Sequence, residues 1–143
     1  MALSSPFLVG VYENKVLIKT YKESGRTSEI LPLVLAEICD EFEIENIYFA
    51  NGPGSFMAIK VTYVFLQTMS ISLNVDIFAA DGFEFNHNAP IRALKKVYFV
   101  KEEGEIKMRR FDEEIEDQFE LPQLLQHDRF TKNCDPLYVL PAV

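Results

Sequence analysis

The chain has 143 residues, 48% of them hydrophobic and 25% charged, which is typical of a soluble globular protein of one domain or one domain with a small appendage. The formal net charge of −8 argues against direct nucleic-acid binding, which depends on Lys and Arg facing phosphates. The two cysteines are too few for a disulfide scaffold, and Cys39 is expected to be buried helix filler. Residues 1–7 do not have the pattern of a signal peptide, so we predict a cytoplasmic protein with no membrane contact.

The first part of the chain predicts a hairpin followed by a helix. Two β-prone runs, 7–12 and 16–21, are separated by a three-residue turn. A helix is expected over 29–42, with Pro32 tolerated near its start. Acidic residues crowd the C-terminal end of that helix and form either a patch for a basic partner or a solvated end.

The middle of the chain predicts a βαβ unit. A buried strand over 47–50 and a second over 75–79 flank a long helix over 55–74, so the two strands should be parallel. A glycine turn connects the first strand to the helix and serves either as a structural turn or as a phosphate-binding loop, with serine as the expected N-cap. The turn consists of Asn51, Gly52, Pro53, Gly54 and Ser55.

The long helix is apolar on two opposite sides. A helix at the surface of a globular protein needs only one apolar stripe, so the second side must be covered by a partner protein or by the chain's own C-terminal segment. Lys60, Gln67 and several hydroxyl residues argue against a membrane span. The candidate partner-binding residues on this helix and on the preceding one are Leu31, Val34, Ile38, Met57, Val61, Val64, Phe65 and Thr68.

The remainder of the chain predicts a smaller unit. A second hairpin is expected over 97–101 and 106–111, then a short helix near 121–125 and an edge strand over 137–140. The polar, turn-rich residues 86–90 favour a boundary there. We therefore expect an N-terminal domain over 1–88 and a C-terminal subdomain over 89–143.

Three segments resemble the TsaB family, also called YeaZ. NGPGSFMAIK (51–60) is similar to the family signature GPGSFTGLR, and TSEILPLVLAEI (27–38) is similar to the family's S-x-x-L-L-P helix. DPLYVLP (135–141) resembles its P-x-Y-L segment. The resemblance covers about the first 85 residues well and the last 10 weakly.

This resemblance implies an α/β fold of the actin-like ATPase (ASKHA) and ribonuclease-H-like type, with a mixed sheet flanked by helices and a reduced, truncated second half. It also implies a non-catalytic scaffold subunit of the machinery that makes N6-threonylcarbamoyladenosine at position 37 of tRNA. The partners would be the catalytic subunit TsaD, bound and activated through a helical interface, and the ATPase TsaE, with a homodimer as a further form. The RNA would be contacted only indirectly.

Two departures from the family pattern affect this reading. The family's first-strand aspartate, which in actin-like ATPases helps to hold a nucleotide-bound metal, falls at Ser4. We therefore expect no cofactor on this chain, with ATP used by partner subunits. The family helix is glycine-rich, whereas this one carries Met57, Val64 and Thr68, so its interface should be repacked at a wider helix separation.

The sequence contains no recognisable catalytic or metal motif. His87 and His127 are forty residues apart, and no HExxH, HxxxH or GxSxG pattern occurs. We predict no catalytic residues and no metal site. The alternative is a degenerate nucleotide-binding ATPase or an inactive peptidase homologue of the same fold.

Overall fold

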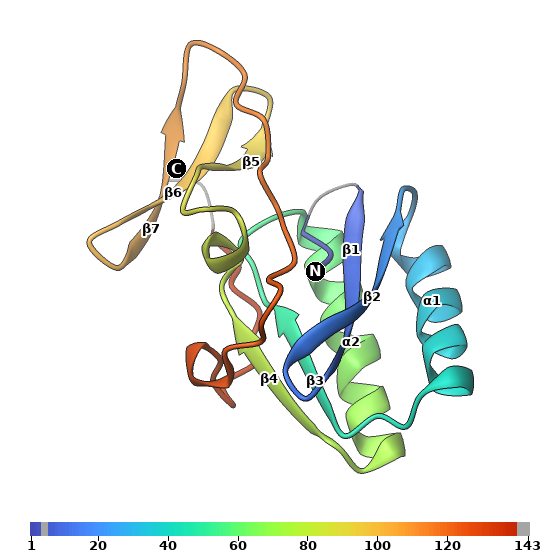
Figure 1. Cartoon of the computed structure of the whole chain (residues 1–143). Coiled ribbons are helices and arrows are strands. Elements are labelled where there is room, and N and C mark those ends of the chain that lie inside the picture. The colour runs from blue at the N-terminus through green and yellow to red at the C-terminus, as the bar shows by residue number, and fades with distance from the viewer. Residues whose placement is uncertain (4–5, 140–143) are drawn as a thin grey trace.

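The computed structural model describes residues 1–3 and 6–139 (Figure 1). Ser4, on which the doubt about nucleotide binding depends, lies outside the described residues. The elements are β1 (Phe7–Glu13), β2 (Val16–Glu23), α1 (Thr27–Glu41), β3 (Asn46–Ala50), α2 (Phe56–Leu73), β4 (Asp76–Ala80), a 3-10 helix (Gly82–Phe85), β5 (Ile91–Leu94), β6 (Val97–Glu102), β7 (Glu105–Arg110) and a 3-10 turn (His127–Arg129).

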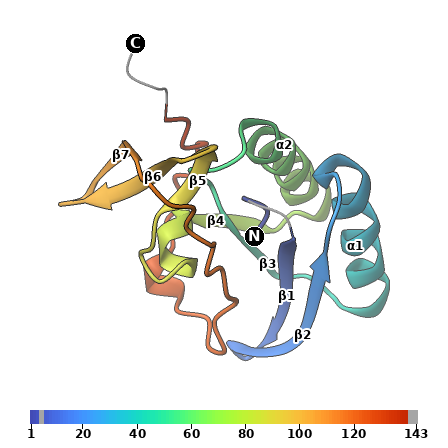
Figure 2. The same cartoon turned by 90° about the horizontal axis from the view of Figure 1, so that it is seen from above.

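The N-terminal part contains two strand pairs covered by two helices. β1 and β2 form an antiparallel hairpin, and β3 and β4 form a parallel pair joined by α2, as the sequence predicts. Helices α1 and α2 lie side by side (Figures 1 and 2). The α/β class is confirmed, but β1 and β3 do not hydrogen-bond to each other, so the mixed sheet is divided into two pairs.

The buried face of α1 holds this helix to the hairpin. Leu31, Val34 and Ile38 are 4–5% exposed and recur at the three- to four-residue spacing that places side chains on one face of a helix. They pack against Phe7 and Tyr21 of the hairpin. Burial of three aliphatic side chains of this size contributes roughly 5–9 kcal/mol of transfer free energy, which makes the contact a main source of stability for the hairpin.

The C-terminal part forms an antiparallel sheet of β5, β6 and β7 around Tyr98, which is fully buried. Its hydroxyl accepts a hydrogen bond from the amide of Ile115 at 2.7 Å, which holds the segment directly after β7 against this sheet. The predicted hairpin over 97–101 and 106–111 is confirmed as β6 and β7.

The segment after β7 returns to the N-terminal part (Figure 2). Leu124 forms an isolated bridge with Val16, and Thr131 forms one with Ala79 of β4. The predicted helix over 121–125 is wrong, because the main chain at 123 and 125 pairs with residues 17 and 15. The strand predicted over 137–140 is absent from its described residues, 137–139, although the amide of Leu137 bonds to Asn51. The division at residue 88 stays a prediction.

Candidate partner-binding surface

Helix α2 is covered on one side only. Ile59, Thr62 and Leu66 are buried, but the buried residues make up only 17% of the helix. Met57, Val64 and Ile71 are 64%, 55% and 80% exposed and recur every seven residues, which aligns them along the opposite side. Length and composition alone would also allow α2 to cross a membrane, which is weak evidence. Among residues 1–3 and 6–139, no part of the chain buries Met57, Val64 or Ile71, although Tyr138 packs on Phe56 at the start of α2.

Helix α1 adds to the same exterior. Leu33 is 70% exposed and lies opposite the buried residues of α1, as Met57 does on α2. We call the exposed residues Leu33, Met57, Val64, Thr68 and Ile71 the two-helix face. Apolar side chains gathered on two adjacent helices are characteristic of an interaction surface.

The eight predicted partner-binding residues divide into two groups. Met57, Val64 and Thr68 are exposed, and the Thr68 hydroxyl donates to the Val64 carbonyl at 2.8 Å. Val61 and Phe65 are partly buried, Phe65 against the core under α1. The inward-facing residues of α1 are outside the two-helix face, and their part in partner binding stays a prediction: Leu31, Val34 and Ile38.

Sequence reasoning missed Leu33 and Ile71. Leu33 lies among several neighbouring apolar residues, and composition alone does not show which of them faces the sheet. The available signal was its position, about 200° around the helix from Leu31, when 100° is allowed for each residue. For Ile71 the signal was its position seven residues after Val64, which places both on the same side of α2.

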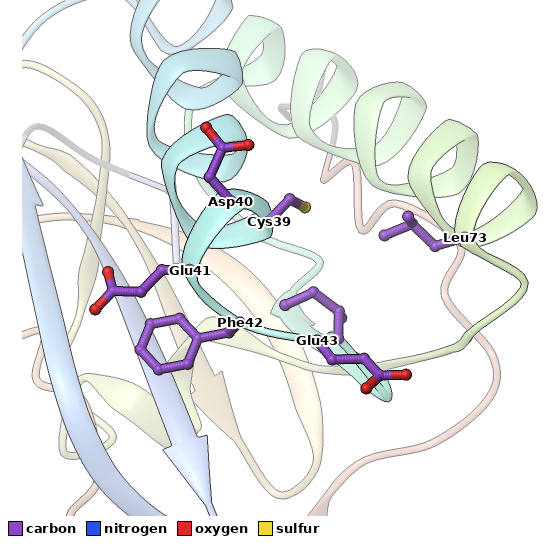
Figure 3. Close-up of a pocket in the computed structure, with 7 residues that line it drawn as sticks. Cys39, Asp40, Glu41, Phe42, Glu43 and Leu73 are labelled. Carbon is purple, nitrogen blue, oxygen red and sulfur yellow. The ribbon is translucent and has the colours of Figure 1, made fainter.

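A hollow of about 540 Å³ lies where the C-terminal ends of α1 and α2 approach (Figure 3). Cys39 and Leu73 point toward one another across it, from α1 and α2 (Figure 3). The carboxylates of Asp40 and Glu43 border it and are exposed. Glu41 is paired with Lys19 at 2.7 Å. The acidic end of α1 therefore adjoins the apolar exterior of α2, and a basic side chain of a partner would meet both.

Cys39 lies at the surface, so its prediction as buried filler is wrong. Ile38 is the residue that faces the core at this point of α1, so the neighbouring Cys39 is turned away from it. Cys134 is buried, and burial raises the pKa of its thiol. At pH 8 we expect Ellman's reagent to modify one thiol per native chain rapidly and both after denaturation. The Cys39→Ser variant should lose the rapid phase; two rapid thiols in the native protein would contradict this arrangement.

The glycine turn is a junction between distant parts of the chain. The amide of Asn51 donates to Ala80 at 3.1 Å, and its carbonyl accepts from Leu137 at 2.8 Å. The Gly52 carbonyl accepts from Gly82 at 2.8 Å. The Asn51 side-chain amide donates to the carbonyl of Asp135 at 2.9 Å. These bonds fix the end of β3 to the end of β4 and to the last described residues.

Both glycines in the turn leave no room for a side chain. A Cβ atom on Gly54 would lie 2.8 Å from the Leu3 carbonyl oxygen. Ser55 stands at the N-cap, but its hydroxyl makes no capping bond; its amide donates to Leu3 at 3.3 Å and its carbonyl accepts from Ile59. The predicted hydroxyl cap is therefore wrong. The close contact of residue 3 with the turn supports the structural reading of the turn over an open phosphate-binding loop.

Both histidines make side-chain contacts at the surface. His127 lies 2.8 Å from the Tyr48 hydroxyl, and His87 lies 3.0 Å from the Glu120 carboxylate. Within residues 1–3 and 6–139, no three side chains of His, Cys, Asp or Glu are grouped so as to hold a metal ion.

Comparison with known proteins gives a consistent result. No family model matches the chain. Over 94 residues, 62% of this chain, it is 27% identical to the tRNA threonylcarbamoyladenosine biosynthesis protein TsaB of Buchnera aphidicola, and it spans 42% of that relative's length. A solved structure of YeaZ from Pseudomonas aeruginosa superposes with a TM-score of 0.56 at 15% identity, covering 71% of this chain and 57% of the other.

A second solved structure, of an uncharacterised protein described as similar to the peptidase YeaZ from the same organism, gives a TM-score of 0.54 at 15% identity over 71% of this chain and 57% of the other. At this identity both structures establish the shared fold. The match to TsaB rests on the amino-acid sequence, so it is a separate observation from the likeness of the folds. The chain is thus similar in sequence to a TsaB protein over part of its length and shares the fold of YeaZ.

Proposed function

We propose that the chain is a non-catalytic scaffold subunit of the machinery that makes threonylcarbamoyladenosine at position 37 of tRNA. In this proposal the two-helix face binds the catalytic subunit TsaD and holds it in an active arrangement. The chain functions in the cytoplasm and needs no cofactor of its own, since ATP is used by partner subunits. The support from known proteins is the likeness to a curated TsaB over part of that relative's length.

The observation that carries the proposal is the bare exterior of α2. Met57, Val64 and Ile71 are each more than half exposed on a helix that is apolar around its circumference. Full burial of such side chains by a partner stabilises a complex by roughly 1.5–3 kcal/mol each, before the costs of association. A second chain packed with helices against this surface would complete a four-helix contact. The same face in a second copy would produce the homodimer.

The charge of the chain favours an indirect role toward RNA. With a net charge of −8 the chain repels a phosphate backbone, so a basic partner holds the tRNA in this proposal. The acidic hollow at the end of α1 adds a place where a basic residue of TsaD binds beside Leu73. The ATPase TsaE joins the complex through the same assembly.

Two measurements test the proposal as a whole. Co-expression with the host's own TsaD should yield a complex of both chains in size-exclusion chromatography. Mass spectrometry of tRNA from a strain lacking this chain should show loss of the threonylcarbamoyl modification, restored by the wild-type gene. Intact modification in the deletion strain would exclude a TsaB role.

The alternative, a degenerate ATPase or inactive peptidase homologue, has its own test. Calorimetric titration with ATP and magnesium should give no heat of binding under the scaffold proposal. Micromolar binding would favour the ATPase reading. Main-chain hydrogen bonds join Asn51 and Gly52 to the end of β4 and to Leu137. They give the turn a structural role, which supports the scaffold proposal over the ATPase alternative.

A further inference from the structure

Half of the cations of this acidic chain lie in its small C-terminal sheet. Residues 91–110 contain seven of the 14 Lys and Arg residues and three of the 22 acidic residues, so their local net charge is +4 while that of the whole chain is −8. These residues form β5, β6 and β7, which project from the N-terminal part (Figure 1). A charge asymmetry of this kind decides which side of a chain a polyanion approaches.

The strand register gathers five of these cations at one end of the sheet. Arg92 of β5 and Arg109 of β7 both lie opposite Tyr98, and Arg110 lies opposite Val97. The turn that joins β5 to β6 adds two lysines at the same end, whereas the three glutamates lie around the turn from β6 to β7. We call the cations at the first end the basic corner: Arg92, Lys95, Lys96, Arg109 and Arg110.

Three cations of the basic corner carry charge that no carboxylate offsets. Lys95 and Arg110 are exposed and form no ion pair with any residue in the ranges 1–3 and 6–139. The Lys96 ammonium group donates to the main-chain carbonyl of Asp112 at 2.8 Å, and this oxygen has no formal charge. All three side chains are therefore able to meet an anion from outside the chain.

The other two cations are held by weak surface pairs. Arg92 lies 3.6 Å from a carboxylate oxygen of Glu114, and Arg109 lies 2.5 Å from one of Glu102. Both arginine side chains are about half exposed, at 45% and 55%. Exposed ion pairs contribute at most about 1 kcal/mol, so a phosphate can replace either carboxylate at little cost.

Two acidic residues next to the basic corner limit its affinity. Asp112 and Glu113 follow β7 directly and are exposed. Their charges lower the local potential and repel a polyanion that approaches the corner. Removing these two charges should therefore have the opposite effect to removing those of Lys95, Lys96 and Arg110.

We propose that the basic corner contacts the phosphate backbone of the tRNA that the partner subunit holds. This inference rests on the proposed function and adds one direct contact to an otherwise indirect role. The net charge of the chain opposes a stable complex with RNA alone, so the contact strengthens and orients a complex that TsaD forms. The small sheet and α1 lie on opposite sides of the molecule, so the two-helix face stays free for TsaD (Figures 1 and 2).

The first test measures tRNA affinity of the complex of this chain with TsaD. The probe is a labelled tRNA transcript with unmodified adenosine at position 37, followed by fluorescence anisotropy over a range of salt concentrations. The variant with Lys95→Gln, Lys96→Gln and Arg110→Gln should weaken binding at least about tenfold and lower the salt slope by roughly two. The variant with Asp112→Asn and Glu113→Gln should strengthen binding by about two- to threefold.

A matched control separates the basic corner from the net charge of the chain. The variant with Lys15→Gln, Lys22→Gln and Arg26→Gln removes three exposed cations from the N-terminal part and should bind tRNA as the wild type does. Equal affinity of the corner variant and the wild type would overturn the inference, and so would equal loss in the control. Loss of TsaD from the corner variant would overturn it in favour of a protein contact.

The free chain gives a second, independent test. Amide NMR spectra at low salt should show shifts confined to residues 92–96 and 109–111 on titration with a short single-stranded RNA, with weak affinity. The corner variant, with folding checked by circular dichroism, should not show them. Absent shifts, or shifts spread evenly over the chain, would overturn the inference. Failure of the proposed function is a separate result, namely that the wild-type chain does not co-purify with TsaD.

Discussion

Val64→Asp is expected to abolish co-purification with TsaD while the chain stays folded. Val64 is 55% exposed at the middle of the two-helix face, so the carboxylate is hydrated in the free chain and unpaired when a partner covers it. Valine and aspartate have similar helix propensities, so α2 should persist. The expected loss is at least a hundredfold in affinity, roughly 2.7 kcal/mol, which is typical of a central interface residue.

The control for this prediction is Leu94→Asp. Leu94 lies on β5, away from both helices, and is 68% exposed. Its substitution therefore replaces an exposed apolar residue by the same charged one. Its affinity for TsaD should equal that of the wild type, measured by calorimetry on purified chains. Equal loss in both variants would show a general effect of charge, and unchanged affinity of Val64→Asp would contradict the proposed interface.

Gly52→Ala is expected to cause the largest loss of stability among single-methyl changes. Gly52 has φ +125°, a region that residues with a side chain rarely adopt, and its new Cβ would lie 2.8 Å from the Leu137 carbonyl oxygen. Backbone strain and a main-chain clash in a packed region together cost about 3 kcal/mol. At about 3 °C for each kcal/mol, the melting temperature should fall by roughly 10 °C.

Gly104→Ala provides the comparison. Gly104 also has a positive φ, +80°, but a Cβ there would meet no atom within 4 Å. Its expected cost is about 1 kcal/mol, from the backbone conformation alone. Thermal denaturation of both variants separates strain from steric clash. Equal melting temperatures for the two would contradict the close approach of residue 137 to the turn.

Local patterns were sufficient to predict the two hairpins, both long helices and the parallel strand pair of this fold. The β1–β2 and β6–β7 hairpins follow from short turns between β-prone runs, and the β3–α2–β4 unit follows from a glycine turn between a strand and a long apolar helix. Each of these depends on neighbours close in sequence. The exposed side of α2 also follows from sequence, since a helix apolar on two sides in a short chain has little of its own protein left to cover it.

Long-range pairings could not be predicted in the same way. The segment 121–131 meets β2 and β4 only at isolated bridges, Leu124 with Val16 and Thr131 with Ala79, which are too short to leave a periodic pattern in the sequence. Whether Leu33 or Val34 faces the sheet is decided by how α1 is rotated about its axis. The division of the strands into the pairs β1–β2 and β3–β4 is likewise a relation between distant elements that no local motif encodes.

The contacts that fix the glycine turn have a consequence for synthesis on the ribosome. Thr131 exchanges main-chain bonds with Ala79, and Leu137 closes the turn at Asn51, so two late residues complete a structure begun some fifty to ninety positions earlier in the chain. While the nascent chain is still being extended, the outer edge of β4 and the carbonyl of the turn are open to water or to chaperones. The two-helix face is thus translated long before the contacts of Thr131 and Leu137 can form.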